Sequence, residues 1–144
     1  MSNSFPKYHV PVLSEELVNG LRVKPEGKYI DCTLGEAGHT QAILDSTEPA
    51  PTILGIDLDL DAISSSKKSL DSYSKNVTLV NDNFGNLEAI AAKNGFSSVD
   101  GVFFDLGLSS LQLEKQGRGF SFRSDDYLDM RFDKNQDFTA WDVI

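Results

Sequence analysis

Apolar runs that end in polar or acidic residues alternate with stretches of helical spacing over the first 105 residues of the chain. The apolar runs predict strands at 28–33, 52–57, 77–80 and 99–105, and the stretches around them predict helices at 14–20, 39–46, 59–73 and 86–94. Alternation of this kind is typical of an α/β fold with a parallel sheet, right-handed crossovers and helices on both faces.

The composition places the chain among globular proteins of about one domain. Its 144 residues are close to the roughly 150 of a typical domain, and the hydrophobic share of 40% is enough for a packed core. One cysteine excludes a disulfide scaffold and, with only two histidines, no metal site is expected. Lys and Arg number 13 against 22 Asp and Glu, so the net charge is −9 and any nucleic-acid contact must rest on a local patch. No apolar run approaches the roughly 18 residues of a membrane span, so we expect a soluble, cytoplasmic protein without membrane contact.

The periodic pattern ends after Leu106. Residues 117–137 mix glycine, aromatic and charged side chains, which predicts an ordered functional loop that leads out of the domain, and 141–144 predict the start of another helix. An open sheet of four strands would leave the fourth strand as an apolar edge, which is a liability in a finished protein. We therefore expect the chain to be part of a longer one, and a homodimer paired along this edge would also cover it.

Acidic side chains gather at the expected carboxyl edge of the sheet, where ligands of such folds bind. They are Asp31, Glu36, Asp57, Asp82 and Asp105. The loop at 35–38 lacks the G-x-G-x-x-G word, and these carboxylates would repel a pyrophosphate by several kcal/mol at an effective dielectric of about 20. We therefore reject a dinucleotide in favour of S-adenosylmethionine, which has no phosphate and carries a sulfonium and an ammonium group.

Several residues of this edge have a structural and a functional interpretation. Gly35 and Gly38 either let the backbone approach the methionyl end of the cofactor or serve a tight turn. Asp57 follows Gly38 by 19 positions (57 − 38), close to the roughly 20 that place an acid on a cofactor ribose, and the alternative is a helix cap. Phe84 is either a core residue or an adenine-stacking face. His39 is expected to be a first-turn helix residue that touches the loop rather than a base.

Several longer sequence motifs resemble those of one known family. They are HVPVL at 9–13, YIDCTLG at 29–35, GHT at 38–40, DGVFFDLGLSS at 100–110, RGFSFR at 118–123 and LDMR at 128–131. In this order they resemble the MraW (RsmH) family of S-adenosylmethionine-dependent enzymes, which methylate the N4 of a cytosine in the decoding centre of 16S rRNA. The sequence differs from the family pattern at two places. Glu36 and Ala37 lie in a loop that is usually richer in glycine, and Leu111 stands where the family tends to have proline.

The resemblance implies a Rossmann-like class I methyltransferase fold, of which the chain would hold the first four strands and their helices. Residues 1–110 would form the N-terminal part of that domain, and 111–144 would lead into a helical substrate subdomain inserted after the fourth strand. The resemblance also implies S-adenosylmethionine as cofactor and 16S rRNA of the small ribosomal subunit as partner. The family's cofactor contacts fall on Ala37, Gly38, His39, Asp57, Phe84, Asp105 and Gln112, and Gly35 joins them from the loop.

Asp105 is the residue expected to carry the chemistry. An exocyclic cytosine amine is a poor nucleophile because its lone pair is delocalised into the ring, and an acceptor against its N–H restores lone-pair density as the methyl group moves. In amino-methyltransferases that acceptor follows the fourth strand, which here is Asp105 or a nearby backbone carbonyl. The alternative is that Asp105 contacts the cofactor only.

The RNA-contacting candidates are Ser109, Ser110, Arg118, Phe120 and Arg123. Arginines with aromatic residues between them suit an RNA loop whose base is splayed out and stacked. The acids Asp125, Asp126, Asp129 and Asp133 leave a second interpretation open, in which an arginine–aspartate network inside the protein orders this loop.

Two other function classes stay open for the sequence. One is a small-molecule or protein methyltransferase, and the other is a non-catalytic module that holds the cofactor or a partner. Because later strands are missing from the expected fold, we expect the chain as given to be inactive and a protein extended past Ile144 to transfer methyl groups.

Overall fold

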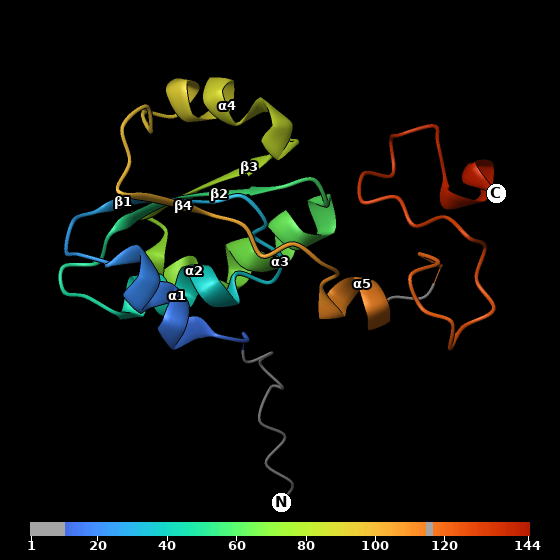
Figure 1. The fold of residues 1–144 in the computed structure, drawn as a ribbon, viewed down its shortest axis with the longest axis horizontal. Helices are drawn as coiled ribbons and strands as arrows, with labels where there is room; N and C mark the ends of the chain where they lie inside the picture. Colours follow the sequence, from blue (N-terminus) through green and yellow to red (C-terminus); the bar gives the residue numbers. More distant parts are fainter. Residues whose placement is uncertain (1–10, 115–116) are drawn as a thin grey trace, which may run out of the picture.

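The computed structural model describes residues 11–114 and 117–144, and its centre is a four-stranded parallel sheet (Figure 1). The strands are β1 (Lys28–Asp31), β2 (Thr52–Asp57), β3 (Val77–Asn81) and β4 (Gly101–Phe103). They lie in the order β3-β2-β1-β4, and every neighbouring pair is parallel. The predicted parallel α/β fold is confirmed, and β4 is an edge strand in which Val102 is exposed, as expected.

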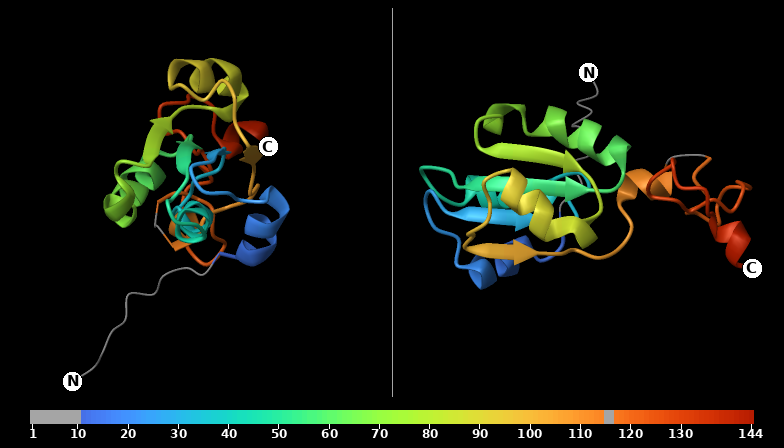
Figure 2. Two further views of the ribbon diagram at one scale, coloured as in Figure 1. Left: turned by 90° about the vertical axis from the view of Figure 1, so that its left-hand side faces the viewer. Right: turned by 90° about the horizontal axis from the view of Figure 1, so that it is seen from above.

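Helices cover both faces of the sheet, as predicted. α1 (Ser14–Leu21), α2 (Gly38–Asp45) and α3 (Leu60–Ser69) lie on one face, and α4 (Leu87–Lys93) lies on the other (Figures 1 and 2). Successive residues of a strand point to opposite faces, so each strand supplies both cores. Tyr29 and Ile53 pack in the core with the three helices, whereas Ile30 and Leu54 pack in the core with α4. Among the described residues, no helix is both long and apolar enough to cross a membrane.

The strand register brings the carboxyl ends of all four strands to one edge. Asp31 at the end of β1 pairs with Gly55 in β2 and with Phe103 at the end of β4, and Asp57 at the end of β2 pairs with Asn81 at the end of β3. The loops that follow the strands therefore start at the same edge, which is where open parallel sheets bind ligands.

The ends of α1 differ from the predicted ones. The sequence predicts Ser14 as the cap, but Leu13 holds the cap position in a left-handed conformation, and the Ser14 hydroxyl donates to the Pro11 carbonyl oxygen (2.9 Å). The helix also continues one residue past its predicted end at Gly20. Arg22 then adopts the left-handed conformation and its N–H donates to a carbonyl of the last turn, so no glycine is needed to end the helix.

Other predicted elements are shorter in the structure, including the strand at 28–33, which ends at Asp31, and the helix at 86–94, which spans Leu87–Lys93. The predicted helix at 59–73 divides into α3 and a 3₁₀ turn at Asp71–Tyr73, with the buried Leu70 between them. The predicted strand at 99–105 pairs only at 101–103, because the Asp105 N–H donates to the Thr33 hydroxyl instead of a neighbouring strand. The end of β4 is thereby turned toward the loop that follows β1.

Beyond β4 the chain leaves the sheet at its carboxyl edge (Figures 1 and 2). A short helix, α5 (Ser110–Glu114), was not predicted, because five residues are too few to show a helical period. Residues 117–144 contain no strand, and the predicted final helix is a 3₁₀ turn at Ala140–Val143. Backbone hydrogen bonds order this segment, from the Met130 N–H to the Arg118 carbonyl (3.0 Å) and from the Trp141 N–H to the Leu128 carbonyl (2.9 Å).

A methyl group at position 55 should destabilise the sheet. A Cβ on Gly55 in β2 would lie 2.8 Å from Leu34 Cδ1 and 3.0 Å from Leu79 Cδ2. Gly55→Ala should therefore lower the free energy of unfolding by about 1–3 kcal/mol, measured by urea denaturation. The control is Gly20→Ala in α1, where the added Cβ meets nothing within 4 Å and should be neutral or stabilising by up to about 1 kcal/mol. Equal stabilities for the two variants would contradict this account of the packing.

Candidate functional site

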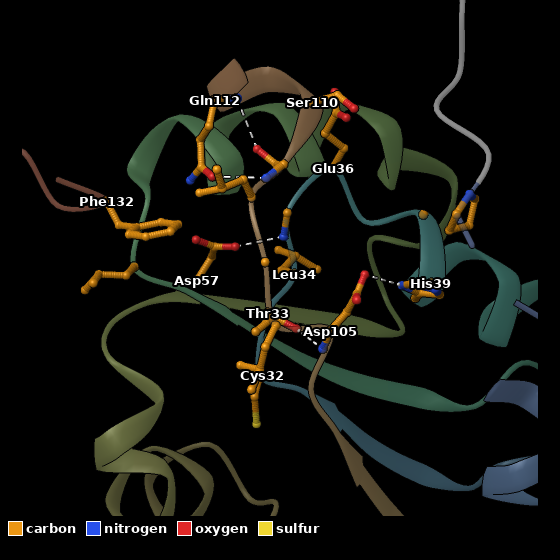
Figure 3. A pocket seen from close by; sticks show the side chains of 18 of the residues that line it. Cys32, Thr33, Leu34, Glu36, His39, Asp57, Asp105, Ser110, Gln112 and Phe132 are labelled. Atoms are coloured by element: carbon orange, nitrogen blue, oxygen red, sulfur yellow. Dashed lines mark hydrogen bonds and ion pairs between the residues drawn. The ribbon is translucent and has the colours of Figure 1, made fainter. Parts of the chain in front are cut away.

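A cavity of about 580 Å³ opens at the carboxyl edge of the sheet (Figure 3). The loops after all four strands line it, together with α5 and one residue of the segment 117–144. Its polar wall includes Asp57 and Asp105, and its apolar wall includes Phe84, Leu108 and Phe132. A cavity of this size and mixed character is typical of a site for a small-molecule ligand or cofactor.

The loop after β1 forms one wall of the cavity and is tied to β2. Gly35 has a φ of +53°, which glycine adopts without strain, and its N–H donates to Asp57 Oδ2 (2.8 Å). Gly38 begins α2 close to Pro11, whose Cγ would lie 3.1 Å from a Cβ at position 38. Both glycines serve local geometry and both line the cavity, so their structural and functional interpretations are compatible. Their contact with a cofactor stays a prediction.

Ala37 is not among the residues that line the cavity, and its predicted cofactor contact stays a prediction. Its methyl group is buried in the core, and its N–H donates to the Leu34 carbonyl oxygen (2.8 Å). Its φ of +64° lies in the left-handed region, where a glycine would be unstrained. Ala37 therefore shapes the loop, whereas its neighbours Glu36 and Gly38 line the cavity.

Asp57, at the end of β2, joins two loops through its carboxylate. Oδ2 accepts the Gly35 N–H, and Oδ1 accepts the Asp59 N–H (2.8 Å). Burial raises the pKa of Asp57 above its ordinary value, and the two N–H donors act in the opposite direction. The alternative of a helix cap is wrong, because Asp59 caps α3 by accepting the Asp61 N–H (2.9 Å). Asp57 keeps further lone pairs for a ligand in the cavity.

Asp105 and His39 face each other on another wall (Figure 3). Asp105 Oδ2 lies 3.4 Å from His39 Nδ1, and the Asp105 side chain is 67% exposed. His39 lies in the first turn of α2, as predicted, and its Nε2 is 2.9 Å from the Val12 carbonyl oxygen. Both ring nitrogens thus have partners within the protein, which fits the expectation that His39 is not a base. The Asp105 backbone is fixed by the Thr33 hydroxyl, which accepts its N–H at 2.6 Å.

Phe84 follows β3 and presents an exposed ring to the cavity. The side chain is 42% exposed and makes an edge-to-face contact with Phe104, with ring centroids 5.5 Å apart. The core interpretation of Phe84 is therefore wrong. Its flat apolar face is open to an aromatic ligand, and stacking on adenine stays a prediction.

Gln112 is buried in α5 and holds the cavity wall together. Its Oε1 accepts the Ser109 N–H (3.0 Å), and its Nε2 donates to Asp59 Oδ2 (3.2 Å). Gln112, Ser109 and Ser110 all line the cavity. Both ends of the Gln112 amide bond within the protein, so its predicted cofactor contact would add to a structural role.

Three of the five acids expected at this edge line the cavity, namely Glu36, Asp57 and Asp105. Asp31 is instead buried, where its carboxylate accepts the Thr40 hydroxyl (2.7 Å) and the Thr33 N–H (3.1 Å). The Asp82 carboxylate accepts hydrogen bonds from two asparagines of the turn that follows it. The carboxylates of Asp31 and Asp82 are therefore held by local hydrogen bonds and do not line the cavity.

The structure contradicts an RNA contact for Arg118 and Phe120. The Arg118 side chain is 5% exposed, and its guanidinium bonds to Asp59 Oδ2 (2.9 Å) and Asp61 Oδ2 (3.2 Å). Phe120 is buried and packs against Phe132, with ring centroids 5.4 Å apart. The arginine–aspartate network is the correct interpretation for Arg118. Its partners are at the start of α3, however, and not among the acids nearby in the sequence.

Arg123 is exposed, so its predicted RNA contact is compatible with the structure. Nothing in the sequence indicates Phe132, which lines the cavity from a segment without any period. The role of Asp59 has a local signal, because an aspartate at the start of a helical stretch is typical of a helix cap.

The buried Asp31 should make stability depend on pH. Burial raises the pKa of Asp31 from 3.8 to about 6. Between these two pH values the folded chain therefore keeps a proton that the unfolded chain has lost. Tighter proton binding by the folded chain adds to its free energy of unfolding. This addition is fully present below pH 3.8 and is lost as the pH rises through about 6, so the free energy of unfolding decreases by about 3 kcal/mol. Asp31→Asn removes the titration. The difference in unfolding free energy between the two chains, from denaturation at several pH values, should change across this range and be constant above it; a difference independent of pH would contradict the assignment.

Comparison with known proteins places the chain close to one group of sequences. A family model described as "MraW methylase family" matches residues 6–144. Ribosomal RNA small subunit methyltransferase H of Dehalococcoides mccartyi is 48% identical over 136 residues, which are 94% of this chain and 39% of that protein. The protein of the same name from Brevibacillus brevis is 44% identical over 137 residues, 95% of this chain and 44% of its own length. The chain thus spans about two fifths of the length of these curated relatives.

A solved structure supports the fold alone. The crystal structure of a SAM-dependent O-methyltransferase from Thermotoga maritima superposes with a TM-score of 0.52 at 17% identity, and the match covers 67% of this chain and 35% of that one. The parallel sheet with helices on both faces is therefore the Rossmann-like arrangement expected from the sequence.

Proposed function

The chain belongs to the MraW methylase family, and on this premise we propose that it forms the S-adenosylmethionine pocket of an enzyme that methylates RNA of the small ribosomal subunit. The finer proposal is that the methyl group goes to the N4 of a cytosine in the decoding centre of 16S rRNA. The observation that supports it best is a single cavity lined by Asp57, Phe84 and Asp105, from three different strand ends.

The cavity suits a cationic cofactor that carries a ribose and an aromatic base. S-adenosylmethionine supplies an electrophilic methyl group on a positively charged sulfur. Glu36, Asp57 and Asp105 line the cavity, and no Lys or Arg of the described residues does. Two unit charges 4 Å apart interact by about 4 kcal/mol at an effective dielectric of about 20, so these carboxylates favour a cation over a pyrophosphate. Asp57 would accept the ribose hydroxyls, and Phe84 would pack against the adenine.

Asp105 would hold the acceptor amine. Its carboxylate is exposed to the cavity, while its backbone is fixed by Thr33 and its Oδ2 faces His39. A carboxylate in this position can accept the N–H of an exocyclic amine and keep the nitrogen lone pair directed at the methyl group. Contact with the cofactor alone is the competing role for Asp105.

The remaining parts of the chain would serve the RNA. Residues 1–110 would be the N-terminal part of the methyltransferase domain, and 111–144 would lead into a helical substrate subdomain. Ser109 and Ser110 at the cavity and the exposed Arg123 are the proposed RNA contacts. Pairing of two copies along the β4 edge stays a prediction, and so does the cytoplasmic location.

Methyl transfer tests the proposed function directly. Tritiated S-adenosylmethionine is incubated with small ribosomal subunits that lack the modification, together with either this chain or a protein extended to the length of the curated relatives. The extended protein should label 16S rRNA at cytosine, whereas this chain should bind the cofactor without transfer. Labelling of metabolites or proteins but not RNA would favour a different methyltransferase, and cofactor binding without transfer by the extended protein would favour a non-catalytic module.

Asp105→Asn in the extended protein separates the two roles of this residue. If the carboxylate holds the amine, kcat should fall about 100-fold while the Kd of the cofactor changes little. A weaker cofactor Kd with nearly unchanged kcat would show that Asp105 contacts the cofactor only. The matched control is Asp82→Asn, an acid of the same edge that does not line the cavity and should alter neither quantity.

Arg123→Met in the extended protein should weaken RNA binding only. Loss of one exposed cation should raise KM for the ribosomal particle and lower the slope of log affinity against log salt by about 1, because one phosphate contact is removed. Calorimetry should give an unchanged cofactor Kd. An unchanged salt slope would exclude Arg123 as a phosphate contact.

A further inference from the structure

A buried ion pair joins the segment 117–144 to the start of α3, next to the cavity. Arg118 and Asp59 are 2.9 Å apart, with side chains 5% and 3% exposed. A buried pair of this kind is costly to break, because removal of one partner leaves the other charge uncompensated. The position of the segment relative to the sheet is therefore strongly determined by this contact.

Asp59 connects that ion pair to the cavity wall. Its Oδ2 accepts from both Arg118 and the Gln112 side chain, and its N–H donates to Asp57. Gln112 and Asp57 line the cavity. Through its carboxylate and its N–H, Asp59 thus links two wall residues of the cavity with an arginine from the distant segment.

Arg118 in turn holds the backbone that carries Phe132. Its Nη2 donates to the carbonyl oxygens of Arg131 (2.9 Å) and Phe132 (3.4 Å). Phe120 lies beneath the guanidinium, 5.6 Å from ring centroid to Cζ, and packs against the Phe132 ring. Phe132 is half-buried and lies on the same side of the cavity as Asp57 (Figure 3).

We propose that Phe132 contacts the ribose–adenine end of the cofactor and that Arg118 and Asp59 are positioning residues that hold it there. This inference rests on the proposed function, since it assigns a further residue to the same pocket. Phe132 is assigned to this end because Arg118 links its carbonyl oxygen to Asp59, and the Asp59 N–H donates to Asp57, whose carboxylate would bind the ribose hydroxyls. An aromatic ring there adds apolar surface against the cofactor without adding charge. Cofactor affinity then depends on the segment 117–144, which the sequence alone associates with RNA.

Calorimetry with S-adenosylhomocysteine measures the contribution of Phe132. Phe132→Ala should weaken the Kd about tenfold, which corresponds to the loss of one packed aromatic contact. The matched control is Phe122→Ala in the same segment, where the ring is 99% exposed and the Kd should change less than about twofold. Circular dichroism and thermal unfolding of each variant establish that it is folded.

A double-mutant cycle tests whether Arg118 acts through Phe132. Arg118→Met should also weaken the Kd about tenfold, and Arg118→Lys should not restore it, because an ammonium cannot reproduce the fork that bonds Asp59 and two carbonyls. The double variant should bind no more weakly than either single variant, since both changes remove the same contact. The control is Arg22→Met, an exposed arginine at the end of α1 that does not line the cavity, and it should keep the original Kd.

Each outcome bears on one of the two proposals. If Phe132→Ala binds as tightly as the unaltered chain, the inference is overturned and the proposed function stands, whether or not the Arg118 variants fold. If the two changes are additive, Arg118 has a structural role independent of Phe132, and the positioning part is overturned. If the unaltered chain binds neither S-adenosylhomocysteine nor S-adenosylmethionine, the proposed function itself fails for this chain and the inference fails with it.

Discussion

Carboxylates at the ends of the strands accept backbone N–H groups of the loops that follow, and the geometry of the cavity depends on these hydrogen bonds. Asp31 accepts the Thr33 N–H, and Asp57 accepts those of Gly35 and Asp59. A loop at the end of a parallel strand has N–H groups without a partner in the sheet, and a charged acceptor satisfies them with a strong hydrogen bond. Asp57, which lines the cavity, therefore both fixes the loops of the wall and presents a carboxylate to a cationic ligand.

Because acids near the strand ends also form hydrogen bonds and ion pairs within the protein, the cavity is less acidic than the sequence suggests. Asp31 is enclosed by Thr40 and Thr33, and Asp59 is neutralised by Arg118, so neither charge reaches the cavity. Glu36, Asp57 and Asp105 do line it, and of these Asp57 and Asp105 follow different strands and lie on different walls. A ligand between them meets negative potential from two sides, which is a better match for a centrally placed sulfonium than for a phosphate.

The segment 117–144 shows how residues of one kind can serve different purposes within a few positions. Arg118 and Arg123 begin and end the same six-residue word, yet the first is buried against α3 and the second is exposed. Phe120 and Phe122 differ in the same way. Burial depends on Asp59, which lies 59 positions from Arg118 along the chain, and an aperiodic segment carries no local signal of such a partner.

The sequence by itself determined the parallel sheet, the two helical layers and the edge at which polar side chains gather. Those features follow from short-range periodicity, because alternation of period two or 3.6 decides which face of each element is apolar. It also placed Asp57, Phe84 and Asp105 at strand ends that the register then brought together. Only the tertiary structure decided which acids face the cavity, that Arg118 is buried, and that Phe132 forms part of the wall. Each of these depends on contacts between segments far apart in the chain, whose pairing is fixed by burial and charge compensation in the folded protein rather than by neighbouring residues.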